Sequence, residues 1–397
     1  SQELKEFLMS AVVDFLTQGA GMIVGFLVAL VPLIILHELG HMLTAKAVGV
    51  WVREFGIGFP PRIVKLFRWQ ETDFTLNWLP LGGFAAMEGE AAMPAAAESA
   101  PEEPSPEQQA YEAEARKHSL YAQPPARRLP IFLSGPLMNI LIAWVVAVAL
   151  YLPGLPVIDA MEVHITGVAP NSPAELAGIQ PGDVLVSIGG QPVETMDTVV
   201  NFTTEHLGVE IPLTVRRNGA EMTVRLTPRT NPPEGEGAMG VALQGQVVAQ
   251  HYEKLPFSQA VARGSGLFWE SVKQLIRLPA DLISGVLPWA TARPIGIVNI
   301  SRLSYETLQM SADTGTLLPI LSLVMSVSLS LGIFNLLPVP ALDGGYILFT
   351  LVEMISGKAM TPALQARLNY VAMLLLLLIF AAVTVLDILY PVSLFTP

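Results

Sequence analysis

The sequence predicts an α-helical polytopic membrane protein with four transmembrane helices, a membrane-associated β region and an inserted small α+β domain. Apolar residues make up 52% of the 397 residues and charged residues only 14%, whereas roughly 25% are charged in an ordinary soluble protein. Four apolar runs approach the length of about 20 residues that a helix needs to cross a bilayer. The stretch between the second and third runs is long and mixed in composition, as expected of a folded extramembrane domain.

The four runs carry no charged residue, which favours burial in lipid. They cover, in chain order, Ala20 to Leu36, Leu129 to Leu152, Thr314 to Pro338 and Asn369 to Leu386. The first run leads directly into His37 and Glu38. A helix that faced lipid would not tolerate these residues, so this end of the span is expected to line a protected site.

Lysine and arginine residues near the ends of the runs set the orientation across the membrane. The loop between the first and second runs is rich in both, and Arg127 and Arg128 abut the second run. The loop between the third and fourth runs carries Lys358 and Arg367. Both loops are therefore predicted to be cytoplasmic. The two termini and the long segment between the second and third runs are predicted to be extracytoplasmic.

The chain is thereby divided into predicted segments, each named by its role. In order, these are 1–46 (N-terminal segment and first span), 47–87 (membrane-associated β region), 88–128 (acidic disordered loop and approach to the second span), 129–152 (second span), 159–229 (small α+β domain), 237–313 (linker and amphipathic helix region), 314–338 (third span), 339–368 (Leu-Asp-Gly motif and cytoplasmic loop) and 369–390 (fourth span).

Two of these segments are predicted from composition. Residues 88–115 consist mainly of Ala, Glu and Pro, which is typical of disorder. Residues 257–285 mix apolar and charged residues, as an amphipathic helix does. The pattern leaves open whether this helix lies on the membrane surface or packs on the protein.

The small domain at 159–229 shows strand patterns and one helix pattern, at 163–168, 184–188, 195–206 (the helix), 211–216 and 222–226. The segment 168–190, with its Pro181-Gly182-Asp183 turn, resembles a PDZ domain of the bacterial, circularly permuted kind. PDZ domains usually capture an extended peptide by adding it to a sheet edge. Two uses stay open for this domain: binding a peptide ligand, or acting as a spacer or size filter.

His37-Glu38-x-x-His41 is the motif that carries chemistry. On a helix, residues four apart lie on one face, about 6 Å apart along the axis. Two imidazoles in that arrangement can share one Zn²⁺. Glu38 can then act as general base on a water molecule at the metal. Ionisable residues at the end of a span need a compensating partner, and a divalent cation supplies one.

Zinc needs a third protein ligand, and the chain has no cysteine. Asp343 is the best candidate, because it follows the third span in a segment where Pro338 and Pro340 prevent a helix. Broken backbone at membrane depth is tolerated only beside protein or a wet cavity. Four histidines are expected to lie in loops or in the extramembrane domain: His118, His164, His206 and His251.

These motifs resemble the site-2 protease family of intramembrane zinc metalloproteases. The resemblance rests on His37-Glu38-x-x-His41 in the first span and on Asn335-x-x-Pro-x-Pro-x-Leu-Asp343-Gly in the third. Further strings agree with family motifs, at 132–139, 293–297, 55–60 and 81–84. The match covers nearly the whole chain in order. The bacterial regulator-of-sigma-E proteases are the most similar group, and many of them carry two PDZ domains where this chain shows one.

The resemblance implies roles for individual residues. His37, His41 and Asp343 would bind one Zn²⁺ per chain, and Glu38 would be the catalytic base. Substrate would be contacted by Asn335, Pro338 and Gly83. In the family the β region pairs with an extended substrate, and the apolar strings 64–67 and 74–79 are candidates for its edges. The second-span motif is expected to serve mainly close helix packing, through Gly135, Pro136 and Asn139.

The predicted function is cleavage of transmembrane segments in single-span membrane proteins, such as anti-sigma factors or remnant signal peptides. The expected location is the bacterial inner membrane, with the active site near the cytoplasmic side. The expected partners are a single-span protein or peptide substrate and the lipid bilayer. The net charge of −12 argues against a nucleic-acid partner.

Two alternatives stay open. One is a membrane-tethered PDZ scaffold with a silent site, although a scaffold has no use for Glu38 beside two histidines. The other is a metal or ion permease, which the absence of an inverted repeat in the sequence disfavours.

Overall fold

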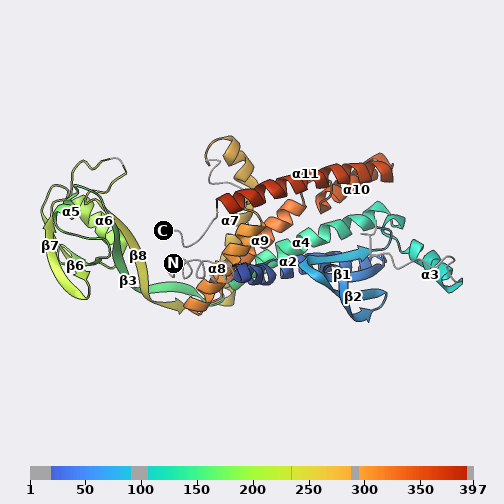
Figure 1. The fold of residues 1–397 in the computed structure, drawn as a ribbon, viewed down its shortest axis with the longest axis horizontal. Helices are drawn as coiled ribbons and strands as arrows, with labels where there is room; N and C mark the ends of the chain where they lie inside the picture. The colour runs from blue at the N-terminus through green and yellow to red at the C-terminus, as the bar shows by residue number, and fades with distance from the viewer. Residues whose placement is uncertain (1–18, 91–105, 234, 288–294, 391–397) are drawn as a thin grey trace, which may run out of the picture. The chain divides into compact units, whose positions relative to one another are not determined.

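The computed structural model describes residues 19–90, 106–233, 235–287 and 295–390. The chain divides into two compact units (Figure 1). The first comprises Ser1–Tyr151 together with Phe257–Pro397, and the second comprises Leu152–Pro256. The first unit contains the membrane helices and the β region.

Four described helices are long and apolar enough to cross a membrane, at Gly19–Ala47, Pro125–Ala149, Leu318–Asn335 and Ala363–Leu389. The prediction of four spans is confirmed. The first helix is interrupted at Leu30, and its second part is α2 (Val31–Ala47). The others are α4, α9 and most of α11 (Pro362–Leu389). The last begins earlier than predicted because its first turns carry Arg367, which ended the uncharged run.

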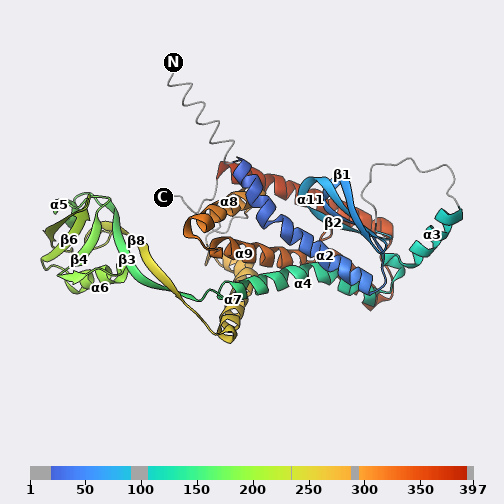
Figure 2. The same cartoon turned by 90° about the horizontal axis from the view of Figure 1, so that it is seen from below.

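Helix α4 packs against α2, α9 and α10 (Asp343–Ser356), and Figure 2 shows it running alongside α2 and α9. Glycines at the crossings allow the backbones to approach. A Cβ atom added at Gly40 of α2 would lie 2.6 Å from the Ser134 carbonyl oxygen, and one added at Gly332 of α9 would lie 2.9 Å from the Pro136 carbonyl oxygen. Small residues at such crossings are typical of membrane helix association.

Helix α10 corrects the prediction that residues 339–368 form a motif and a loop. Pro338 and Pro340 both precede Asp343, which is the first residue of α10. Neither proline therefore interrupts this helix. The segment 237–313 contains the predicted amphipathic helix as α7 (Phe257–Ile283), but the part predicted as a linker also contains β8 (Val241–Glu253) and α8 (Ile297–Thr314). The buried face of α8 is mostly polar, so no apolar stripe marks it in the sequence.

Helix α7 packs on the end of α4. A Cβ added at Gly264 would lie 2.5 Å from Val148 Cα, and Trp144 Nε1 donates a hydrogen bond to Ser265 Oγ at 3.0 Å. The sequence left open whether this amphipathic helix lies on the membrane surface or packs on the protein. The first half of α7 packs on the protein.

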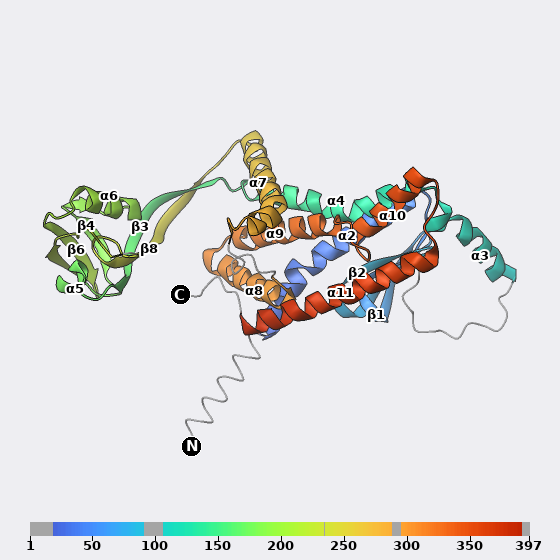
Figure 3. The same cartoon turned by 90° about the horizontal axis from the view of Figure 1, so that it is seen from above.

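Helix α11 contacts α8 at one end and approaches the start of α10 at the other (Figure 3). The buried Asp387 accepts hydrogen bonds from the backbone N–H of Gly296 at 3.2 Å and of Asn299 at 3.1 Å, and so caps the first turn of α8. Only 11% of the apolar window of α11 is buried. Most of its surface therefore faces outward, as expected of a span that contacts lipid.

The β region is a hairpin of β1 (Val52–Trp69) and β2 (Thr72–Met87) that packs against α2. The first part of β1, residues 52–57, pairs with the end of β2, residues 83–87, and also with its beginning, residues 73–76. The hairpin is therefore curled. Its inner side joins a buried cluster with α2 and α4, which brings the end of β2 to the membrane helices.

The acidic stretch 88–128 is in part helical. Residues 91–105 lie outside the described residues, whereas α3 (Pro106–Lys117) is an ordered helix. The prediction of disorder is wrong for α3. Its sequence is rich in Ala, Glu, Gln, Arg and Lys, which favour helices, and Pro106 suits a first helical position.

The second unit is a sheet with two short helices, α5 (Pro173–Leu176) and α6 (Met196–Glu205). The strand order is β7-β6-β4-β3-β8, with β5 paired to β4. The strands that precede β8 are β3 (Leu155–Val168), β4 (Val184–Ile188), β5 (Gln191–Pro192), β6 (Ile211–Arg217) and β7 (Ala220–Leu226). The predicted strands and helix are present within a few residues of their expected positions. The domain itself is longer than predicted, because β3 starts earlier and pairs along its length with β8.

An ion pair between the half-buried Arg217 and the buried Asp183 joins the Pro181–Asp183 turn to β6. Arg217 donates two hydrogen bonds of 2.7 Å to the Asp183 carboxylate. This guanidinium, helped by the backbone N–H of Gln180, holds the pKa of Asp183 below its usual range.

Candidate metal centre

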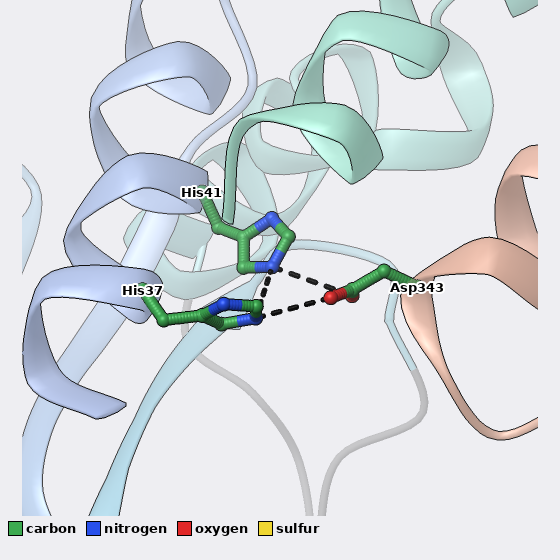
Figure 4. Close-up of side chains that lie close together, drawn as sticks. All are labelled: His37, His41 and Asp343. Carbon is green, nitrogen blue, oxygen red and sulfur yellow. Dashed lines mark hydrogen bonds and ion pairs between the residues drawn. The ribbon is translucent and has the colours of Figure 1, made fainter. Parts of the chain in front are cut away.

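The two histidines of the first span lie one helical turn apart on α2 and are both buried. His37 is 6% exposed and His41 is 5% exposed, and their Nε2 atoms are 3.2 Å apart. Residues four apart share one face of a helix, so both imidazoles leave α2 on the same side. That side faces α4 and the start of α10 (Figure 4).

Asp343 completes the group from the first turn of α10. Its carboxylate oxygens lie 3.0 Å from His37 Nε2 and 3.3 Å from His41 Nε2 (Figure 4). Ligand atoms of a tetrahedral zinc with bonds of about 2.0 Å are about 3.3 Å from one another, so these separations fit one zinc ion. Within the described residues, no other group of His, Asp and Glu comes together in this way.

Each histidine also has a partner at its other ring nitrogen. His41 Nδ1 lies 2.7 Å from the carbonyl oxygen of Ile131, which accepts its N–H and leaves Nε2 for a metal. His37 Nδ1 lies 3.2 Å from Asn139 Nδ2, while Asn139 Oδ1 is buried without a hydrogen-bond partner among the described residues. A half-turn of this amide places Oδ1 against His37 Nδ1–H, which satisfies both atoms.

Gly135 of α4 lies directly against the ligand atoms. A Cβ added there would lie 2.2 Å from His41 Nε2 and 2.7 Å from His37 Nε2. Glycine is therefore needed at this position to leave room between the histidines and α4. The expectation that Gly135 and Asn139 serve mainly helix packing is incomplete, since both contact the histidines. Gly135 and Asn139 are four residues apart in the span that follows the histidine motif, so they lie on one face of the helix. This spacing was the signal in the sequence that both could contact the histidines.

Glu38 lies beside the end of β2. A Cβ added at Gly83 would be 4.0 Å from Glu38 Cγ. Because Gly83 has no side chain, the strand backbone itself faces the carboxylate. Residues 83–85 of β2 therefore lie beside the base. The role of 64–67 and 74–79 as edges for substrate stays a prediction.

The other residues predicted to contact substrate lie on the segment that leads to Asp343. Asn335 is the last residue of α9 and is half-buried, and Pro338 is exposed in the loop that follows. Their roles stay predictions.

A cavity of about 580 Å³ lies next to the turn that carries Asp343. It is lined by α4, α10 and α11, with an aromatic wall of Phe132, Tyr346 and Phe349. Its polar side includes Arg128, which donates a 2.6 Å hydrogen bond to Glu353 and so joins α4 to α10. The volume is that of a typical ligand pocket.

The sequence profile of peptidase family M50 matches residues 25–379. The chain belongs to this family. It is 28% identical to the zinc metalloprotease RasP of Geobacillus kaustophilus, over 92% of this chain and 97% of that protein. It is 30% identical to a candidate zinc metalloprotease of Rhizobium meliloti, over 90% of this chain and 94% of that protein. A candidate zinc metalloprotease of Clostridium acetobutylicum is 28% identical, over 91% and 95%.

This M50 peptidase is a zinc metalloprotease and an integral membrane protein. His37, His41 and Asp343 form its candidate zinc site. The converging ligand atoms, the carbonyl oxygen behind His41 and the bare Cα of Gly135 all fit a metal ion at this place.

Proposed function

We propose that this M50 peptidase cuts peptide bonds inside the membrane-spanning segments of single-span proteins, and that His37, His41 and Asp343 hold its zinc. The observation that carries the proposal is the meeting of these three side chains where the spans α2 and α4 contact the first turn of α10. A zinc site with two ligands on a span can act on a bond that lies at membrane depth. Substrates such as anti-sigma factors or remnant signal peptides fit this activity.

Glu38 is the proposed general base. When bound, zinc would supply Lewis acidity, which polarises the scissile carbonyl and lowers the pKa of water, so that water loses a proton readily and becomes a strong nucleophile. The Glu38 carboxylate takes the proton of the attacking water and passes it to the departing amine nitrogen. The two histidines and Asp343 keep their positions through Ile131, Asn139 and the first turn of α10.

The backbone at residues 83–85 is the proposed docking edge for substrate. A helical substrate hides its peptide bonds in its own hydrogen-bond ladder, so it must unwind before attack. The freed N–H and C=O groups need partners in lipid. The end of β2 offers such groups beside Glu38, and Asn335 and Pro338 are proposed to contact the unwound chain from the α9 side.

Two substitutions test the proposal in detergent-purified protein. Glu38→Gln should keep about one zinc per chain but lose cleavage of a single-span test substrate by about 100-fold to 10,000-fold. Asp343→Ala should lose both zinc and cleavage. A folded wild type without zinc, or an active Glu38→Gln variant, would refute the mechanism. The scaffold and permease alternatives predict no effect of Glu38→Gln.

We further propose an orientation in the bacterial inner membrane in which the termini and the predicted PDZ domain are extracytoplasmic and the site lies near the cytoplasmic side. The chain has no cysteine, so single introduced cysteines report sidedness without background. Asn218→Cys should react with an impermeant maleimide added outside spheroplasts, whereas Lys358→Cys should not. The domain at Asn218 would bind a peptide or exclude substrates with bulky outer domains.

A further inference from the structure

The loop that delivers Asp343 has an unusual backbone. Ala341, two residues before the ligand, has a φ of 72°, in the left-handed region that residues with a side chain seldom adopt. Gly344 and Gly345, just after the ligand, are packed against the same loop, since Cβ atoms added there would lie 2.0 Å from the Leu337 carbonyl oxygen and 2.5 Å from that of Val339. Such a conformation persists only where neighbouring groups hold it.

Asn369 of α11 supplies two hydrogen bonds to this turn. Its Oδ1 accepts the backbone N–H of Ala341 at 3.2 Å, and its Nδ2 donates to the Tyr346 hydroxyl at 3.0 Å. The Asn369 amide therefore hydrogen-bonds one residue two positions before Asp343 and another three positions after it. Polar side chains of this kind often join membrane helices across a bundle.

The second of these bonds leads on toward the histidines. The Tyr346 ring stacks on Phe132 of α4, with centroids 5.2 Å apart. Phe132 follows Ile131, whose carbonyl oxygen lies 2.7 Å from His41 Nδ1. Asn369 is thus connected to the environment of both Asp343 and His41, although it belongs to a span that supplies no metal ligand.

We propose that Asn369 is a positioning residue for the zinc site: it holds Ala341 in its left-handed conformation and Tyr346 in place, and so keeps Asp343 aimed at the two histidines. This inference rests on the proposed function, because it assumes that Asp343 binds the zinc. Without the amide, the N–H of Ala341 loses its acceptor and the turn relaxes toward ordinary backbone angles. Asp343 then spends less time within reach of the metal.

The test compares three variants of the full-length protein in detergent. Asn369→Leu keeps a similar volume and removes both hydrogen bonds. Tyr346→Phe removes one of them and leaves the bond to Ala341. The matched control is Gln365→Leu, one turn earlier on α11, which removes a 3.1 Å hydrogen bond to Tyr121 that does not touch the Asp343 turn.

Two measurements are made on each variant: the rate of zinc loss to an excess of chelator, and kcat and KM for a single-span test substrate at saturating zinc. We expect Asn369→Leu to lose zinc about tenfold faster or more and to show a lower kcat with little change in KM. Tyr346→Phe should show a smaller effect in the same direction, and Gln365→Leu should match the wild type.

Three outcomes would overturn the proposal. The first is wild-type zinc retention and kcat in Asn369→Leu. The second is an equal effect in Gln365→Leu, which would mean that loosening α11 anywhere is enough. The third is a change in KM alone. If Asn369→Leu does not fold, the graded loss in Tyr346→Phe decides.

Failure of the proposed function would look different. A folded wild type that binds no zinc removes the basis of both proposals. A wild type that holds zinc and cleaves, beside an Asn369→Leu variant that does the same, removes only this one.

Discussion

One methyl group at Gly135 is expected to abolish zinc binding without unfolding the protein. In Gly135→Ala the new Cβ would lie 2.2 Å from His41 Nε2, whereas ordinary contact begins at 3.4 Å. His41 would have to retreat by about 1.2 Å, but a metal ligand tolerates a displacement of only about 0.2 Å. Because a misplacement of about 1 Å can cost about 100-fold in rate, kcat/KM should fall at least that far.

The assay has three readouts: zinc per chain by elemental analysis, the cleavage rate of a single-span test substrate, and Tm in the same detergent. The control is Gly266→Ala on α7, where an added Cβ has no atom within 4 Å. Alanine favours a helix by about 0.5–1 kcal/mol over glycine, so this variant should keep its zinc and its activity, with a Tm equal to or slightly above that of the wild type. A Gly135→Ala variant with one zinc per chain and wild-type cleavage would refute the geometry of the site.

Three further predictions concern supporting contacts. Asn139→Leu removes the partner of His37 Nδ1, so zinc affinity in a chelator competition should fall by about 10-fold to 100-fold; wild-type affinity would contradict this role. Arg217→Met removes the group that lowers the pKa of Asp183. Because that pKa is lowered in the folded state, the stabilisation is present above the unfolded value of about 3.9 and is lost as pH falls through the folded value. Hydrogen exchange of β4 and β6 should therefore differ between this variant and the wild type at neutral pH and converge in strong acid; a difference independent of pH would exclude the ion pair as its cause. Asp387→Leu removes the cap of α8, at a cost of about 0.5–2 kcal/mol, and should speed exchange in the first turn of that helix; unchanged exchange would show that the cap contributes little.

The features that the sequence predicted are those that local patterns encode. Four uncharged runs gave the spans, because crossing a bilayer requires a continuous apolar segment. The spacing of His37 and His41 placed both on one helix face. Asp343 stood out because prolines interrupt the chain just before it. The structure brings these three residues together, as the sequence predicted.

The features that were missed depend on partners far away in the chain. Strand β8 pairs with β3, and the sequence of one strand carries no signal that identifies the other as its partner. The contacts of Asn139 with His37, and of Asn369 with Ala341, join different helices, so they appear only once the helices are packed. The buried residues of α8 are mostly polar. A search for apolar residues at helical spacing therefore does not detect this helix.

The order of the metal ligands along the chain has a consequence for biosynthesis. Two ligands are made early, in α2, whereas Asp343 follows His41 by 302 positions. A nascent chain that has not yet reached α10 carries only two of the three proposed zinc ligands, and a catalytic zinc needs three protein ligands. If Asp343 is the third ligand, the zinc site can be completed only after the third span and the first turn of α10 have been made. A product that stops short of Asp343 is therefore expected to be inactive, because it lacks the third proposed ligand.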